Sequence, residues 1–328
     1  MLPLPAFKLH RPRTIEEAAA LLAQLGDRAR LVAGGTDIVP NMKHGLVDAK
    51  ALVSLQQVEA LRGIKEENGA LVIGAMTNLD AVADDARIRE TAPALAEAAA
   101  GVGGPHHRRM GTLGGNLCLD TRCRYYNQTY FWRSALGFCL KKDGSVCHVV
   151  AGGQKCVAAA SNDTAPALIA LDASIVLESV RGRREVEAKS FYTADGIRNT
   201  VLERDEIVAG VRVPLAAGRR SAFDKLRRRN AIDFPLLSVA ARADVADGKV
   251  SAIEVVVSAL AARPRQLKAA QKIQAGTAAT GELVSRLAEA SKRECKPLDN
   301  VEGDPDWRHD MVPIVVGRVL SRALGLSG

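Results

Sequence analysis

The chain has 328 residues, of which 47% are hydrophobic and 25% are charged, and its formal net charge is +8. These proportions are ordinary for a water-soluble globular protein, and the length favours two or more domains. Aromatic residues make up only 4% of the chain and the basic residues are scattered, which disfavours a nucleic-acid partner. No stretch approaches about 18 consecutive apolar residues. The first residues, MLPLPAFKLHRPRT, contain no signal-peptide core, so we expect a cytoplasmic protein without a membrane span.

The N-terminal region predicts a helix, a strand and a glycine-rich turn, in that order. Thr14 to Glu17 form a capping box, and apolar residues at helical spacing follow it. A short apolar strand then leads into Ala33-Gly34-Gly35-Thr36-Asp37, and a helical turn is expected from Ile38 to Lys43. A glycine turn between a strand and a helix start can bind a phosphate, although an empty tight turn would have the same sequence. The chain lacks the dinucleotide pattern G-x-G-x-x-G and the P-loop pattern.

The central part predicts strands at 51–55 and 71–75, and a helix over 78–100 that breaks near Pro93. A second glycine-rich turn follows, Gly111-Thr112-Leu113-Gly114-Gly115-Asn116. Further on, the polar stretch 161–166 predicts a helix start, and strands are expected at 174–178 and 206–213.

A second unit is predicted near residue 219. Strand-like stretches at 237–243 and 252–259 flank an Asp247-Gly248 turn, which is a hairpin signal. Helical patterns follow at 264–274, 280–292 and 309–324. We therefore divide the chain into residues 1–218 and 219–328, and we predict an α+β fold.

Five of the six cysteines lie between residues 118 and 156. Cys123, Cys139, Cys147 and Cys156 are separated by 15, 7 and 8 residues, which matches neither the close pairs of zinc sites nor the runs of ferredoxins. The spacing alone leaves an iron–sulfur cluster, a zinc ion and buried free thiols open. We leave out Cys118, which follows the second glycine turn, and Cys295, which lies in a polar helical segment.

The two glycine turns, with the stretch Asn162 to Leu168 and the segment Phe223-Asp224-Lys225 with Arg228, resemble the flavin subunits of molybdenum hydroxylases. The resemblance covers nearly the whole chain. It implies an α/β FAD-binding domain of the PCMH type with two subdomains, and a C-terminal α+β domain like that of the carbon monoxide dehydrogenase flavoprotein. It also implies FAD contacts at Leu31, Val32, Ala33, Gly34, Gly35, Thr36, Asp37, Ile38, Val102, Gly111, Thr112, Gly114, Gly115, Asn116, Asp163 and Lys225. Val102 would lie near the adenine and Lys225 near the flavin ring.

A long insertion marks one branch of this family. Here 46 residues separate Asn116 from Asp163, where most members have only a few. The β subunit of 4-hydroxybenzoyl-CoA reductase carries such an insertion, with an additional 4Fe–4S cluster. The resemblance therefore implies that residues of about 118–158 bear a 4Fe–4S cluster held by Cys123, Cys139, Cys147 and Cys156.

The resemblance implies an electron-transfer subunit with no catalytic residue of its own. Its partners would be a large subunit with the molybdenum cofactor and a small subunit with 2Fe–2S clusters, in a heterohexamer of two heterotrimers. A ferredoxin-like donor would supply electrons for the removal of the phenolic hydroxyl from 4-hydroxybenzoyl-CoA, in anaerobic aromatic degradation. Two alternatives stay open: the flavin subunit of an ordinary molybdenum hydroxylase, which passes electrons to NAD or a quinone, and a zinc-bearing module with empty glycine turns.

Overall fold

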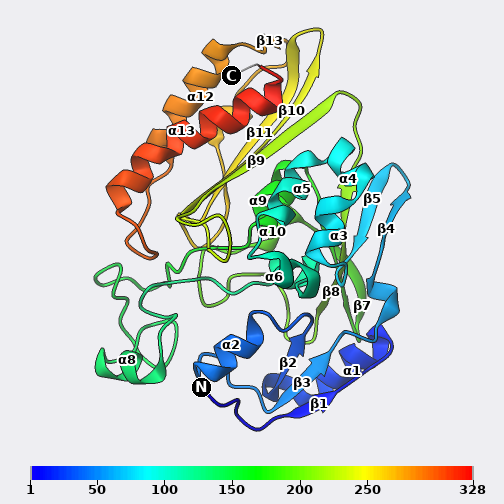
Figure 1. Cartoon of the computed structure of the whole chain (residues 1–328), viewed down its shortest axis with the longest axis vertical. Helices are drawn as coiled ribbons and strands as arrows, with labels where there is room; N and C mark the ends of the chain where they lie inside the picture. Colours follow the sequence, from blue (N-terminus) through cyan, green and yellow to red (C-terminus); the bar gives the residue numbers. More distant parts are fainter. Residues whose placement is uncertain (1, 327–328) are drawn as a thin grey trace.

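The computed structural model describes residues 2–326. Its N-terminal subdomain, at the bottom of Figure 1, is a three-stranded parallel sheet in the order β1-β3-β2 with two helices. These elements are β1 (Lys8–His10), α1 (Ile15–Leu25), β2 (Ala29–Val32), α2 (Ile38–Lys43) and β3 (Ala51–Ser54). The predicted capping box is confirmed, because the Thr14 side chain accepts a hydrogen bond from the Glu17 amide.

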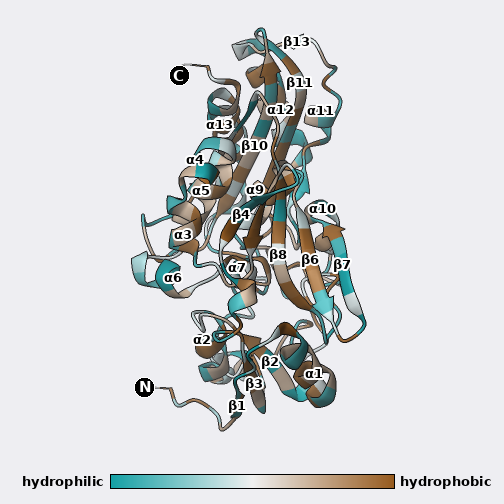
Figure 2. Cartoon of the chain, turned by 90° about the vertical axis from the view of Figure 1, so that its right-hand side faces the viewer, coloured by the Kyte–Doolittle hydropathy of each residue, from teal (hydrophilic) through white to brown (hydrophobic). Residues whose placement is uncertain are grey.

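The second subdomain is built on a five-stranded antiparallel sheet in the order β4-β5-β8-β6-β7. Its strands are β4 (Ile64–Glu67), β5 (Ala70–Gly74), β6 (Ser174–Ser179), β7 (Gly182–Glu187) and β8 (Ile207–Pro214). Its helices are α3 (Leu79–Asp84), α4 (Ala86–Thr91), α5 (Pro93–Ala100), α6 (Pro105–Met110), α7 (Leu113–Leu117), α9 (Thr164–Ala170) and α10 (Ala188–Phe191). Figure 2 shows apolar residues along β6 and β8, where this sheet forms part of the largest core.

The helix predicted over 78–100 is three separate helices, α3 to α5. The Asp85 side chain accepts hydrogen bonds from the amides of Arg87 and Ile88, so it ends α3 and caps α4. Pro93 then occupies the first turn of α5, where a missing amide hydrogen costs nothing.

The C-terminal domain, at the top of Figure 1, is an antiparallel sheet covered by α12 and α13. Its strands are β9 (Arg219–Leu226), β10 (Leu237–Ala246), β11 (Lys249–Ser258), β12 (Arg265–Gln266) and β13 (Thr277–Ala278), and its helices are α11 (Lys268–Gln271), α12 (Gly281–Glu294) and α13 (Pro305–Leu324). The predicted turn at Asp247-Gly248 joins β10 to β11, with both residues at positive φ. The helix predicted over 264–274 is wrong, because this stretch contains β12 and only one helical turn.

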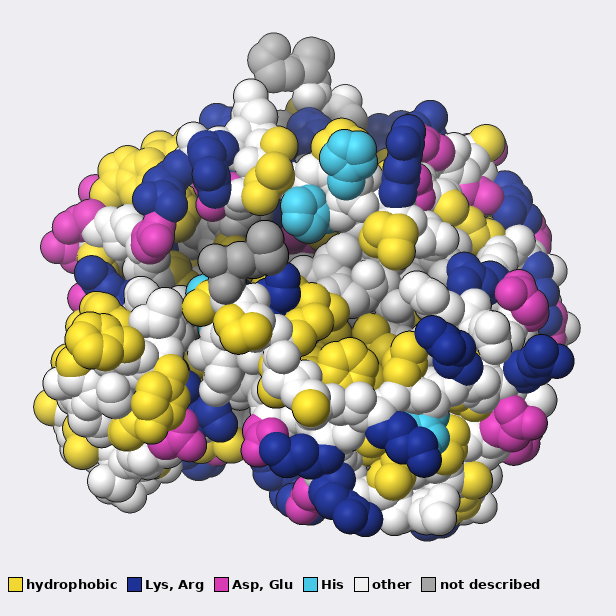
Figure 3. Space-filling model, turned by 60° about the horizontal axis from the view of Figure 1, so that its bottom comes forward, with side chains coloured by type: hydrophobic (Ala, Val, Ile, Leu, Met, Phe, Trp, Pro, Cys, Tyr) yellow, Lys and Arg dark blue, Asp and Glu magenta, His cyan; other side chains and the backbone are white. Residues whose placement is uncertain are grey.

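The insertion is a separate lobe with a single helix, α8 (Tyr130–Ala135), at the lower left of Figure 1. Its two ends are joined, because Arg122 and Ala159 exchange backbone hydrogen bonds of 2.8 and 2.7 Å. The aromatic side chains of Tyr130, Phe131 and Trp132 are exposed. Figure 3, with the lobe at the left, shows apolar side chains grouped on its surface.

Among the described residues, no helix is both long enough and apolar enough to cross a lipid bilayer.

Candidate functional site

The two glycine-rich loops lie against each other in the structure. An added Cβ at Gly34 would be 1.8 Å from the carbonyl oxygen of Met110, at the start of the second loop. At Gly115, a Cβ would lie 3.9 Å from the Cβ of Ala33. A Cβ at Gly114 would also lie 2.7 Å from the Cβ of Ala75. Glycine is therefore required at positions 34 and 114 for the loops and the sheet to approach this closely.

The first loop has a run of backbone amides without protein acceptors. Within residues 2–326, none of the amides of residues 33 to 38 donates a hydrogen bond to the protein. In the second loop, by contrast, Leu113 and Gly114 donate to carbonyls and Gly115 donates to the hydroxyl of Thr112. Successive free amides on a half-buried loop suit an anionic ligand such as a pyrophosphate.

The apolar residues that flank the first loop fix its position. Leu31 packs against the core of the N-terminal subdomain, and Val32 and Ile38 pack against the small apolar cluster around Met42. Their side chains therefore hold the loop from behind, and they leave its backbone free to contact a ligand.

The stretch after the insertion is hydrogen-bonded to the second glycine loop. Asn116 Oδ1 accepts hydrogen bonds from the Thr164 amide at 3.0 Å and from the Thr164 hydroxyl at 2.6 Å. Asn162 Nδ2 donates to the Leu117 carbonyl at 3.0 Å. Thr164 and Asn162 lie in the stretch that the resemblance singled out, although Asp163 was the only residue of this stretch named as a contact. Their partners are more than forty residues away in sequence, and only the fold brings them together.

A buried ion pair connects this stretch to the C-terminal domain. Lys225 Nζ on β9 lies 2.8 Å from Asp163 Oδ2, and both side chains are buried. Burial raises the pKa of Asp163 to about 6, although the Lys225 ammonium opposes this shift. The other carboxylate oxygen, Oδ1, is buried and has no partner in the described structure, so it is free to accept a hydrogen bond.

Val102 follows a residue that contacts Lys225, and its side chain packs against the main apolar core. Lys225 Nζ donates at 3.1 Å to the carbonyl oxygen of Gly101, the residue before Val102.

Asp37 links the first glycine loop to the insertion. Its carboxylate accepts from Asn41 Nδ2 at 2.8 Å and pairs with Arg122 at 3.4 Å. Burial raises the pKa of Asp37, and the Arg122 guanidinium opposes this change. Arg122 also lies 4.0 Å from the ring centroid of Phe234, in the C-terminal domain. Apart from its place next to Cys123, Arg122 carries no sequence signal that would have identified it.

The four cysteines predicted as ligands come together inside the lobe. Cys123, Cys139 and Cys156 share one small buried cluster with Leu46, Tyr126 and Ala158. Burial raises the pKa of the Cys156 thiol, and nearby Cys139 and half-buried Cys147 add to this, whereas the Ala158 amide and the Lys141 ammonium oppose it. All four are free thiols.

The thiols are not arranged as a ready metal site. Within the described residues, no group of three or more Cys, His, Asp or Glu side chains has the geometry to hold a metal ion. Cys118 is exposed, and Cys295 is buried in the core of the C-terminal domain, away from the lobe. Soft thiol donors without carboxylates among them suit an iron–sulfur cluster or zinc.

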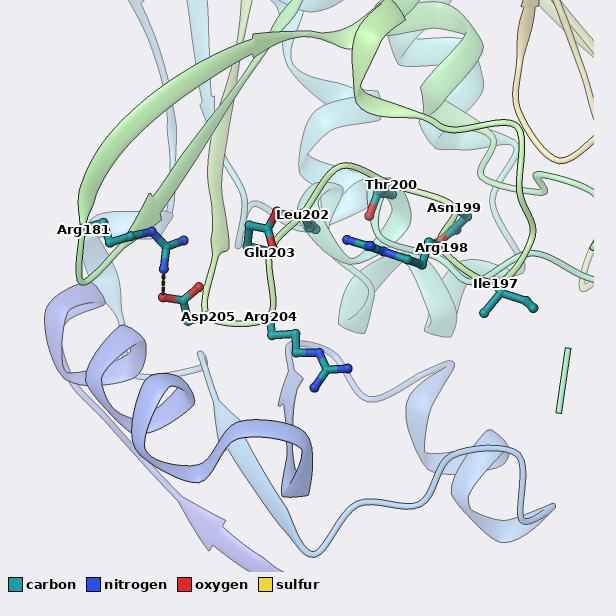
Figure 4. A pocket seen from close by; sticks show the side chains of 9 residues that line it. All are labelled: Arg181, Ile197, Arg198, Asn199, Thr200, Leu202, Glu203, Arg204 and Asp205. Carbon is teal, nitrogen blue, oxygen red and sulfur yellow. Dashed lines mark hydrogen bonds and ion pairs between the residues drawn. The ribbon is translucent and has the colours of Figure 1, made fainter. Parts of the chain in front are cut away.

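A cavity of about 780 Å³ lies apart from these residues, between the β6–β7 turn and the loop before β8 (Figure 4). Arg181, Arg198 and Arg204 line it, and Arg181 pairs with Asp205 at its edge. No residue predicted to contact FAD or iron is among its lining residues.

Comparison with known proteins assigns the chain to a family. Residues 5–216 match the family described as FAD binding domain in molybdopterin dehydrogenase, and residues 221–323 match the CO dehydrogenase flavoprotein C-terminal domain. The chain belongs to the FAD-binding medium subunits of molybdenum hydroxylases. It is thus a flavoprotein and an oxidoreductase subunit, and the predicted family, fold class and FAD cofactor are confirmed.

The relatives of this medium subunit match it along almost its whole length. The carbon monoxide dehydrogenase medium chain of Hydrogenophaga pseudoflava is 31% identical over 98% of both chains. The xanthine dehydrogenase FAD-binding subunit of Escherichia coli O157:H7 is 25% identical over 97% of this chain and 96% of its own. The solved carbon monoxide dehydrogenase from Hydrogenophaga pseudoflava superimposes with a TM-score of 0.81, covering 98% of this chain and 99% of its own at 31% identity.

Proposed function

We propose that this medium subunit carries FAD and a 4Fe–4S cluster and delivers electrons to a molybdenum enzyme of the 4-hydroxybenzoyl-CoA reductase type. The observation that supports the proposal most is that four cysteines come together in a lobe, and that the first segment of this lobe contacts the first FAD loop. Arg122, the residue before Cys123, pairs with Asp37 of that loop at 3.4 Å. A cluster held by Cys123, Cys139, Cys147 and Cys156 would therefore lie close to the flavin domain.

The free amides of residues 33–38 would bind the FAD pyrophosphate, and glycines 34, 35, 111, 114 and 115 would let the cofactor approach the backbone. Thr112 and Asn116 would shape the second loop through their hydrogen bonds to Gly115 and Thr164. The unpaired Oδ1 of Asp163 would accept a hydrogen bond from the cofactor. Three kinds of feature thus fit a bound FAD: a narrow glycine contact, unpaired amides and an unpaired buried acceptor.

When bound, FAD supplies storage for two electrons that can be exchanged singly, and an iron–sulfur cluster supplies a one-electron carrier. The glycine loops would hold FAD and the four cysteines would hold the cluster, and burial of Cys123, Cys139 and Cys156 would limit the access of water to the cluster. The reaction on the partner subunit would convert 4-hydroxybenzoyl-CoA, two electrons and two protons into benzoyl-CoA and water. A ferredoxin-like protein would supply the electrons, in the cytoplasm.

The partners would be a large molybdenum subunit and a small 2Fe–2S subunit, as two heterotrimers. The names of the relatives support a multisubunit enzyme, because they describe medium chains and FAD-binding subunits. The length of the match supports the same placement of this chain within such an enzyme.

The ligand assignment is tested with Cys139→Ser. We expect the purified variant to lose most of its iron and acid-labile sulfide while it keeps its FAD, because the glycine loops lie outside the lobe. Cys295→Ser is the matched control, since this buried thiol lies in the C-terminal domain and should leave the iron content unchanged. Iron content in Cys139→Ser equal to that of the parent would contradict the assignment, and zinc in place of iron would favour a zinc-bearing lobe.

A second candidate is the flavin subunit of an ordinary molybdenum hydroxylase, and the 31% identity to a carbon monoxide dehydrogenase medium chain favours it. The complete complex distinguishes the two. Reduced ferredoxin with 4-hydroxybenzoyl-CoA should yield benzoyl-CoA under our proposal. Formation of a hydroxylated product with reduction of NAD or a quinone would support the hydroxylase.

A further inference from the structure

Lys141 is a buried ammonium group in the loop between Cys139 and Cys147. Its side chain is only 6% exposed, which is rare for lysine. Nζ donates to Asp120 Oδ1 at 2.7 Å, to Thr121 Oγ1 at 2.8 Å and to the carbonyl oxygen of Gly196. An ammonium has three hydrogens, so all three have acceptors here.

The acceptors come from two segments outside the cysteine loop. Asp120 and Thr121 begin the insertion, and Gly196 belongs to the loop before β8 in the flavin domain. The Thr121 hydroxyl also donates to the Gly196 carbonyl at 2.8 Å. Lys141 therefore joins the loop that carries two cysteines to the start of the insertion and to the flavin domain.

Gly196, which accepts a hydrogen bond from Lys141, also contacts a third cysteine, Cys156. The Gly196 amide donates to the Cys156 carbonyl at 2.8 Å, and an added Cβ at Gly196 would lie 2.8 Å from Cys156 Sγ. The Tyr126 ring, which shares the apolar cluster of the thiols, has its centroid 4.8 Å from Lys141 Nζ. The ammonium of Lys141 thus contacts two residues, Gly196 and Tyr126, that also pack against the thiols.

We propose that Lys141 is a positioning residue for the iron–sulfur cluster, and that its fixed positive charge raises the reduction potential of that cluster. The proposal rests on the proposed function, because it takes Cys139, Cys147 and Cys156 as ligands. One-electron reduction adds a negative charge to the cluster. A positive charge held nearby in a buried environment, where water screens little, stabilises the reduced form.

Other charges near the thiols have local partners. Asp120 pairs with Lys141 itself, so it offsets part of the effect. Asp143 pairs with the buried Arg133 and with Lys142. His148 Nε2 is hydrogen-bonded to the Phe138 carbonyl at 2.5 Å. Lys155 precedes Cys156 but is exposed, so water should screen its charge.

The test is a redox titration of the cluster in the intact complex, followed by its electron paramagnetic resonance signal. Lys141→Met keeps the length of the side chain and removes the charge. We expect at least a tenfold lower ratio of reduced to oxidised cluster at the parent midpoint potential, which is a shift of about 59 mV for one electron. Lys141→Arg should stay within about twofold of the parent, because it keeps the charge.

Lys155→Met is the matched control, since it removes an equal charge from the exposed residue next to Cys156. We expect its ratio of reduced to oxidised cluster to stay within about twofold of the parent, because water screens that charge. In the double variant Lys141→Met with Asp120→Asn, part of the shift should be recovered, because no unpaired carboxylate then remains. If Lys141→Met loses iron while Lys141→Arg and Lys155→Met keep it, the positioning role is supported.

Two failures can be told apart. Normal iron content with equal midpoint potentials in Lys141→Met and Lys155→Met would overturn this inference alone. A parent protein that purifies with FAD but without iron and sulfide would overturn the proposed cluster, and the inference with it.

Discussion

The FAD-binding scaffold and the cysteine lobe differ in what holds them together. The scaffold has two sheets, and its main apolar core combines residues of β5, β6, β8, α3 to α5 and α9. The lobe has one short helix, and its small core consists of three cysteines with Leu46, Tyr126 and Ala158. Burial of apolar side chains can stabilise the scaffold without a ligand, whereas the lobe has too little apolar core to do so. The comparison indicates that cofactor removal should affect the two regions unequally.

The scaffold should be most sensitive at its buried ion pair. Lys225→Met leaves the Asp163 carboxylate buried without its partner, and we expect a loss of about 3–5 kcal/mol in unfolding free energy. Urea titration of the chain measures this loss. Arg318→Met is the control, because Arg318 pairs with the adjacent Asp224 at an exposed site and should cost less than about 1 kcal/mol. Equal losses in the two variants would show that burial of the pair does not matter.

The same carboxyl group predicts a pH dependence for the chain without FAD. The pKa of Asp163 is raised from 3.8 to about 6, so folding favours its protonated form. Its contribution, on the order of 3 kcal/mol, is present below about pH 4 and is lost as the pH rises through about 6. Asp163→Asn removes this component. The difference between parent and variant in unfolding free energy should therefore change across this range, and a constant difference would contradict the prediction.

The two glycine loops lie so close together that a side chain added at Gly34 should not fit between them. Gly34→Ala places a Cβ 1.8 Å from the Met110 carbonyl oxygen, which belongs to the backbone and cannot move aside as a flexible side chain could. We expect a loss of about 2–3 kcal/mol in stability and a protein that purifies with little FAD. Gly281→Ala, with nothing within 4 Å of its Cβ position, should keep its flavin and its stability. Full flavin content in Gly34→Ala would show that the loops are farther apart.

If the lobe holds the proposed cluster, removal of its iron should loosen the lobe and leave the scaffold intact. After anaerobic chelation, we expect trypsin to cut at Lys141, Lys142 or Lys155 on the order of tenfold faster, because the lobe loses what orders it. Mass spectrometry of the fragments locates the cuts. First cuts in the scaffold, or an unchanged rate in the lobe, would argue that the lobe folds without a metal centre.

Local patterns in the sequence predicted most of the scaffold. The capping box at Thr14, the first glycine turn and the Asp247-Gly248 hairpin depend on neighbouring residues, and the structure contains all three features. The second glycine-rich stretch differs from the prediction, because its residues from Leu113 onward form the short helix α7. The order of the strands and the breaks at Asp85 and Ala92 depend on packing and capping, which periodicity does not report.

The site was harder to predict where its contacts are long-range. The Asp37–Arg122 pair joins residues 85 apart in sequence, and Lys141 reaches Gly196 across 55 residues. Arg122 and Lys141 form no sequence motif with these partners, so the contacts can be recognised only in the folded chain. The cysteines were identifiable because five of them fall in one short stretch.

Quantitative analysis of iron, acid-labile sulfide and FAD in the anaerobically purified chain tests most directly whether this subunit carries both FAD and a 4Fe–4S cluster. We expect about four iron and four sulfide for each FAD, with the iron lost in Cys139→Ser. One FAD with no iron, or zinc at the four cysteines, would contradict it.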